Sequence, residues 1–145
     1  MKNFTYSIPT VVHFGEGQIK KLGAEIAARA RKVLVVYGRG SVKRNGVFDA
    51  AVAQLKAHNV QWAELPGVEP NPRIATVREG VRLCREQGLD GVLALGGGSV
   101  IDCAKGVAAG ALYDGDPWDF SGKKLTPERA LPIFTVLTMA ATGSE

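Results

Sequence analysis

The chain has 145 residues, of which 46% are apolar and 22% charged, and its formal net charge is +4. This length and apolar content are enough for one compact domain with its own core. The basic residues are spread along the chain without a dense stripe or stacking aromatics, and no segment is long enough to span a membrane. The first residues form no apolar run of the signal-peptide kind. We therefore expect a cytoplasmic protein that binds neither nucleic acid nor membrane.

Two elements are predicted within the first thirty residues. Residues 4–14 carry β-forming side chains around Pro9, which indicates edge strands or a β-hairpin that ends at Gly15. From Gly17 to Ala30, apolar residues recur at spacings of three and four. This spacing predicts an amphipathic helix.

The rest of the chain alternates between strand-like apolar runs and helical periodicity. Strands are predicted at 32–37, 60–65, 91–95 and 133–137, and helices at 47–55, from Pro72 to near Gly88, and after Gly98. This alternation predicts an α/β fold with an open, mainly parallel sheet flanked by helices. The loops that follow the strands would then share one edge, where open α/β sheets bind ligands.

A glycine-rich turn, Gly96-Gly97-Gly98-Ser99, separates a predicted buried strand from a helix and is the strongest chemical signal. Glycines let the backbone approach a ligand closely, and the N–H groups at the helix start suit a pyrophosphate. Ser99 is placed to cap the helix, with Asp102 as the second half of a capping box. The alternative is that the glycines only make a tight turn. Ile101 replaces the third glycine of the usual dinucleotide fingerprint.

The cysteines and histidines give no sign of a metal site. Cys84 and Cys103 lie in predicted helices and form no metal-binding or disulfide spacing, so buried or half-buried thiols are expected. His13 and His58 are far apart in the sequence and lack a helical metal spacing. We therefore assign no metal to these residues.

Four motifs occur in order along the chain: Phe14–Gly17, Glu69–Pro72, Gly96–Asp102 and Thr138–Glu145. Together they resemble the iron-containing (group III) alcohol dehydrogenases, and among these the NADP-preferring butanol dehydrogenases and broad aldehyde reductases. The resemblance implies a Rossmann-like dinucleotide-binding domain over residues 1–145, truncated before a helical domain. The iron ligands, one Asp and three His, would lie beyond Glu145, and the fragment alone would be inactive.

The resemblance also assigns the contacts to the cofactor. Thr138 and Thr142 would line the nicotinamide end, although strand-end and capping roles are an alternative for both threonines. The remaining contacts would be Gly97, Gly98 and Ser99 at the pyrophosphate, Asp102 close to the cofactor, and Asn71 near the adenosine.

Cofactor choice is predicted from the turn after the first strand of the sheet. NAD-preferring members of the family tend to carry an Asp where this chain has Gly38, and a carboxylate there repels a 2′-phosphate. Gly40, Ser41 and the cations Arg39 and Lys43 surround this position. Hydroxyl and cationic groups bind phosphate directly, which favours NADP(H) over NAD(H). Solvent-facing turn residues are the alternative reading of Arg39 and Lys43.

The expected whole protein interconverts alcohols and aldehydes or ketones and is a homodimer. The sequence leaves two rival interpretations open. One is the cofactor domain of a relative with different chemistry, such as a glycerol dehydrogenase or a dehydroquinate synthase. The other is a non-catalytic nucleotide-binding module.

Overall fold

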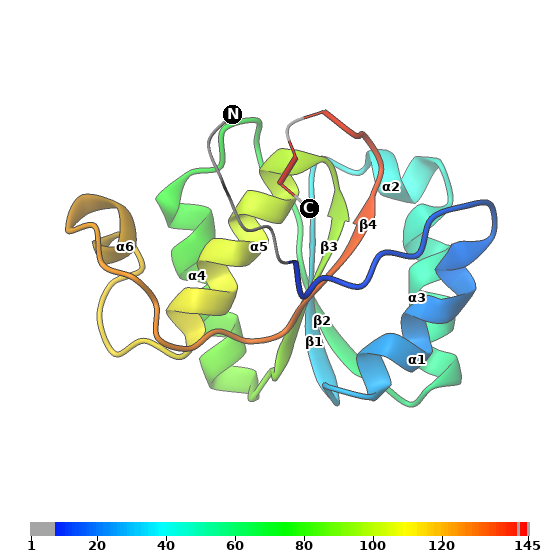
Figure 1. Ribbon diagram of the computed structural model, residues 1–145, viewed down its shortest axis with the longest axis horizontal. Helices are drawn as coiled ribbons and strands as arrows, with labels where there is room; N and C mark the ends of the chain where they lie inside the picture. Colours follow the sequence, from blue (N-terminus) through cyan, green and yellow to red (C-terminus); the bar gives the residue numbers. More distant parts are fainter. Residues whose placement is uncertain (1–7, 142, 145) are drawn as a thin grey trace, which may run out of the picture.

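The computed structural model describes residues 8–141, 143 and 144. Its centre is a sheet of four parallel strands in the order β2-β1-β3-β4 (Figure 1). The strands are β1 (Lys32–Tyr37), β2 (Gln61–Leu65), β3 (Gly91–Gly96) and β4 (Ile133–Leu137). All of β3, and all of β1 after Lys32, is buried, which explains why these two strands read as continuous apolar runs.

Helices cover both faces of the sheet. In Figure 1, α4 (Ile74–Gln87) and α5 (Gly98–Ala111) lie on one side, and α1 (Leu22–Ala27) and α3 (Val47–Ala57) on the other. The shorter elements are η1 (Gln18–Lys21), α2 (Ser41–Arg44) and α6 (Asp119–Gly122). The strand order reverses between β1 and β3, and right-handed crossovers on either side of this point place the helices on opposite faces.

Two apolar clusters form the core because successive residues of a strand point to opposite faces. Leu34 and Val92 belong to the cluster beneath α4 and α5, whereas Val35 and Leu93 belong to the cluster beneath α1 and α3. All four side chains are fully buried. The two central strands are therefore sealed from water on both faces.

The predicted α/β architecture, the four strands and the buried thiols are confirmed. The helix predicted from Pro72 begins two residues later, at Ile74, and its C-cap is Gly88 with a φ of 62°. Burial raises the pKa of the Cys84 thiol to about 12 and that of the Cys103 thiol to about 11. Among the described residues, no helix has the length and apolar character needed to cross a bilayer.

The predicted N-terminal β-hairpin is wrong for the residues that the structure describes. Residues 8–14 form no strand, and residues 4–7 of the predicted hairpin lie outside the described part of the chain. Val12 is 75% exposed and Phe14 is 95% exposed. β-branched and aromatic side chains favour a strand only when a neighbouring strand or a packed face receives them, and none does so here among the described residues.

The helix predicted from Gly17 to Ala30 is also shorter than expected. It starts as the single 3-10 turn η1 and continues as the six-residue helix α1. Its apolar face is still the one predicted, since Leu22 and Ile26 are buried against the sheet.

Candidate nucleotide-binding site

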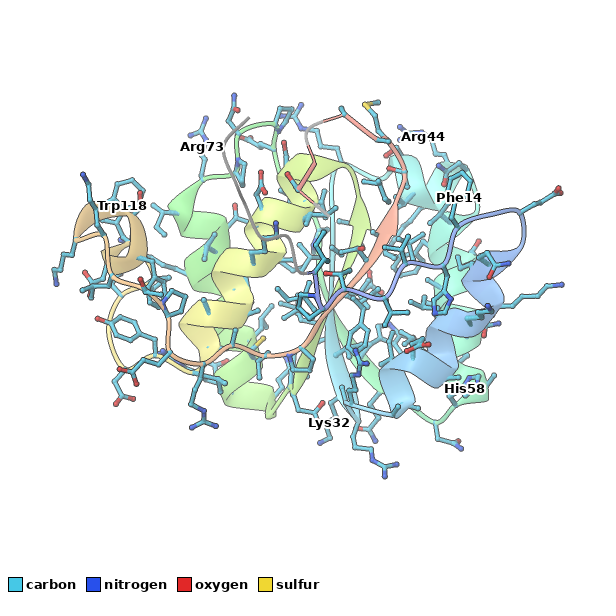
Figure 2. All side chains as sticks on the ribbon, in the orientation of Figure 1. Phe14, Lys32, Arg44, His58, Arg73 and Trp118 are labelled. Carbon is cyan, nitrogen blue, oxygen red and sulfur yellow. The ribbon has the colours of Figure 1, made fainter. Side chains whose placement is uncertain are left out.

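The carboxyl ends of the four strands meet at one edge of the sheet. Figure 2 shows Arg44 and Arg73 at this upper edge, whereas Lys32 and His58 lie at the opposite edge. The loops after β1, β2, β3 and β4 all start here because the strands are parallel. Every predicted site residue that the structure describes comes from one of these loops or from the first turns of the helix that follows.

The glycine turn after β3 connects the strand to α5. A Cβ on Gly96 would lie 2.7 Å from Cγ2 of Val100, so a side chain there would collide with the first turn of α5. Gly97 is the N-cap, with φ −90° and ψ −170°, and its carbonyl accepts hydrogen bonds from the amides of Val100 and Ile101 at 3.0 and 3.2 Å. Gly96 thus has a structural role in this turn.

The next two amides are free to bind a ligand. Within the described residues, no backbone hydrogen bond leaves the N–H groups of Gly98 and Ser99, and both residues are only half-buried. Unpaired amides at the start of the 14-residue helix α5 carry a partial positive charge. Such amides suit an anion such as a pyrophosphate.

Ser99 does not cap the helix as predicted. Helix α5 begins at Gly98, so Ser99 already lies in its first turn and the N-cap is Gly97, which has no side chain. The predicted capping box between Ser99 and Asp102 is therefore wrong. Asp102 lies further along α5 and is exposed. Because glycine at 97 leaves the helix uncapped, the first-turn amides remain available.

The loop after β4 runs beside the glycine turn. The amide of Thr138 donates a hydrogen bond of 3.1 Å to the carbonyl of Gly96. A Cβ on Gly97 would lie 3.7 Å from Cβ of Met139, so this loop lies against the turn. Thr138 is exposed beside the glycines, whereas Thr142 lies outside the described residues.

The turn after β1 is packed against the loop after β2. The amide of Gly67 donates to the carbonyl of Gly38 at 3.1 Å, and the amide of Val68 donates to Tyr37 at 3.2 Å. The carbonyl of Val68 lies 3.5 Å from the position a Cβ on Gly38 would occupy. These contacts hold the two loops together, so that they form one continuous surface.

Three further predicted site residues lie in these two loops. Gly40 has a φ of 106° and is the N-cap of α2, and Ser41 is the exposed first residue of that helix. Asn71 is exposed and has a left-handed φ of 58°. The structure therefore gathers 38–41 and Asn71 on the β1–β2 side of the edge, and 97–102 and Thr138 on the β3 and β4 side.

The two cations predicted beside Gly38 have different partners. Nη2 of Arg39 lies 3.5 Å from Oε1 of Glu69, and Nε of Arg73 lies 2.9 Å from Oε2 of the same carboxylate. Lys43 instead contacts Glu64, with its Nζ 3.0 Å from Oε2. Sequence reasoning missed both carboxylates, although Glu69 opens the Glu69–Pro72 turn that it singled out.

Lys43 belongs to a small network on the α3 side of the sheet. The Tyr37 hydroxyl donates a 2.5 Å hydrogen bond to Glu64, which lowers the pKa of that carboxyl. Burial, followed by this hydrogen bond, raises the pKa of the Tyr37 phenol. The Lys43 ammonium also lies 4.4 Å from the centre of the Phe48 ring. These contacts hold Lys43 against the sheet.

The described residues do not fit an iron centre. Nε2 of His13 lies 3.0 Å from Oε1 of Glu25, and Nδ1 of His58 lies 3.0 Å from the carbonyl of Gln54. No three His, Cys, Asp or Glu side chains of the described chain come together as a metal site.

An open parallel sheet with a glycine turn beside the point where the strand order reverses is the architecture of α/β nucleotide-binding domains. Comparison with known proteins makes the assignment specific. The chain belongs to the iron-containing alcohol dehydrogenase family, whose model matches residues 9–145.

The chain is similar over its whole length to several curated members. It is 57% identical to the probable NADH-dependent butanol dehydrogenase 2 of Bacillus subtilis and 45% identical to the NADPH-dependent aldehyde reductase YqhD of Escherichia coli, covering 37% and 38% of those proteins. The crystal structure of NADH-dependent butanol dehydrogenase A from Thermotoga maritima superposes with a TM-score of 0.95 at 52% identity, over 99% of this chain and 36% of that one. The expected likeness to butanol dehydrogenases and aldehyde reductases is confirmed, and the chain spans little more than a third of these relatives.

Proposed function

We propose that residues 1–145 are the dinucleotide-binding domain of an iron-containing alcohol dehydrogenase or aldehyde reductase. The observation that carries this proposal is the pair of amides at Gly98 and Ser99, which make no backbone hydrogen bond within the described part of the chain and lie where the strand order reverses. A pyrophosphate would accept hydrogen bonds from these amides. Asn71 would lie near the adenosine, Asp102 close to the cofactor, and Thr138 and Thr142 near the nicotinamide.

The reaction proposed for the whole protein is hydride transfer between a nicotinamide and the carbonyl carbon of a small aldehyde or ketone. The cofactor supplies the hydride, and the contribution of these residues is to bind and orient it. Residues 1–145 bring together no metal ligands in their described part, so we expect them to bind nucleotide without turning over alcohol. Two unpaired cysteines favour a reducing compartment such as the cytoplasm.

For the dinucleotide we propose NADP(H). The carboxylate that would repel a 2′-phosphate is absent at Gly38, and exposed Ser41 and Arg39 offer a hydroxyl and a guanidinium beside it. NAD(H) is the second candidate, because butanol dehydrogenases of Bacillus subtilis and Clostridium acetobutylicum that are 57% and 54% identical to this chain are named NADH-dependent.

A thermal-shift titration with NADPH, NADH and ADP-ribose tests both statements. A ligand that binds only the folded state raises its stability with the logarithm of ligand concentration over Kd. All three ligands should raise the melting temperature, and NADPH should do so at the lowest concentration. No shift with any ligand would refute the nucleotide site, whereas a larger shift with NADH would refute only the choice of NADP(H).

We also propose that the protein forms a homodimer. Support comes from apolar side chains in residues 8–14 that no described element covers, among them Val12 and Phe14. Analytical ultracentrifugation should show a dimer, and replacing Phe14 with Ser should raise the dimer dissociation constant. A wild-type chain that sediments as a monomer at every concentration measured would contradict the proposal.

A further inference from the structure

One carboxylate at the candidate site is shared by two arginines. Oε1 of Glu69 faces Nη2 of Arg39 at 3.5 Å, and Oε2 faces Nε of Arg73 at 2.9 Å. Glu69 is the more covered partner, with 37% of its side chain exposed against 76% for each arginine. The carboxylate thus holds one guanidinium from the loop after β1 and another from the start of α4.

This group lies next to Gly38. Gly67 and Val68, which directly precede Glu69, are hydrogen-bonded to the carbonyls of Gly38 and Tyr37. Glu69 therefore brings a negative charge to the part of the edge where residue 38 supplies none. Counting formal charges, the two arginines and Glu69 leave one net positive charge there.

Exposed ion pairs of this kind are weak, and their partners exchange easily. A phosphate accepts hydrogen bonds from guanidinium groups as a carboxylate does, but it carries more charge. We propose that Glu69 is a specificity-determining residue, a built-in anion that occupies Arg39 and Arg73 and competes with the 2′-phosphate of NADP(H) for them. This inference rests on the proposed nucleotide site.

Lys43 differs from these arginines in the way it is held. Its ammonium is bound by Glu64 and lies over the rings of Tyr37 and Phe48, so releasing it would break several contacts at once. The arginines have only Glu69 as an ion-pair partner among the described residues. Of the cations near Gly38, Arg39 and Arg73 are therefore the ones that an arriving phosphate can recruit.

The test is the ratio of the dissociation constants of NADH and NADPH, measured on the full chain by isothermal titration calorimetry at low ionic strength. With Glu69→Gln, the affinity for NADPH should rise about threefold relative to that for NADH, because a competing charge is removed. The gain should shrink at about 0.5 M salt, where exposed charges are screened. Arg39→Gln should weaken the binding of NADPH relative to that of NADH, and so lower the ratio of the NADH dissociation constant to the NADPH dissociation constant.

Glu86→Gln is the matched control, because Glu86 is another exposed carboxylate paired with an arginine, Arg82, but on the helix α4 away from the turn. It should leave the ratio unchanged. If Glu69→Gln leaves the ratio unchanged or lowers it while both dinucleotides still bind, competition by Glu69 is refuted and the nucleotide site stands. If the wild-type chain binds neither dinucleotide, the proposed function fails and this inference fails with it.

Discussion

Replacing Gly97 with valine should remove most of the affinity for a nicotinamide dinucleotide and leave the domain folded. The backbone of Gly97 is extended, and a Cβ would sit at an ordinary 3.7 Å from Met139. The two further methyl groups of valine would add bulk at the residue that directly precedes the Gly98 and Ser99 amides. Loss of one or two charged hydrogen bonds, each about 1.5–3 kcal/mol, should raise Kd by roughly 10–100-fold or more.

Gly97→Ala and Thr135→Val are the comparisons for this variant. Alanine adds only the Cβ and should weaken binding much less than valine does. Thr135 is exposed on the edge strand β4, so valine there should change neither binding nor melting temperature appreciably. If titration of Gly97→Val with NADPH gave the wild-type affinity, the glycine turn would not be the phosphate site.

Truncating Leu93 to alanine should cost the domain a large part of its stability. Leu93 is fully buried in the middle of β3, where it pairs with Val35 on one side and Phe134 on the other. A leucine-to-alanine change in such a core removes about 2–5 kcal/mol, out of about 5–15 kcal/mol for a typical domain. The midpoint of urea unfolding should fall accordingly.

Leu112→Ala provides the same chemical change at a surface position. Leu112 directly follows α5 and is 42% exposed. Its truncation should alter the unfolding free energy by no more than about 0.5 kcal/mol. Similar losses in the two variants would mean that the β3 core is not packed as the structure has it.

The fold was predictable where local and long-range preferences agree. The run 32–37 is apolar and β-branched, and it becomes a central strand because both of its faces are covered. Gly88 was readable as a helix end, since glycine takes the left-handed conformation at a C-cap without steric cost. The glycine turn was readable because its three glycines separate two strongly patterned elements.

The remaining features depend on contacts between distant residues, which no local pattern encodes. Residues of similar β-forming character give a strand at 133–137 and none at 8–14. Within the described part of the chain, the former pair with β3 and the latter have no neighbouring strand. Ser99 has a good capping side chain, but the helix starts before it. The pairing of Arg39 with Glu69 joins loops from two different strands and required the sheet order to be known.

The pairing of β1 with β3 also affects how the chain folds while it is being synthesised. Tyr37 pairs with Leu95, but all of α2, α3, β2 and α4 are synthesised between them, and parallel strands have no hairpin to join them early. One side of β1 therefore stays open until β3 has left the ribosome, and closing that loop is a slow, late event. During this interval the nascent chain presents an unpaired apolar strand, and exposed strands of this kind are prone to pair with other chains.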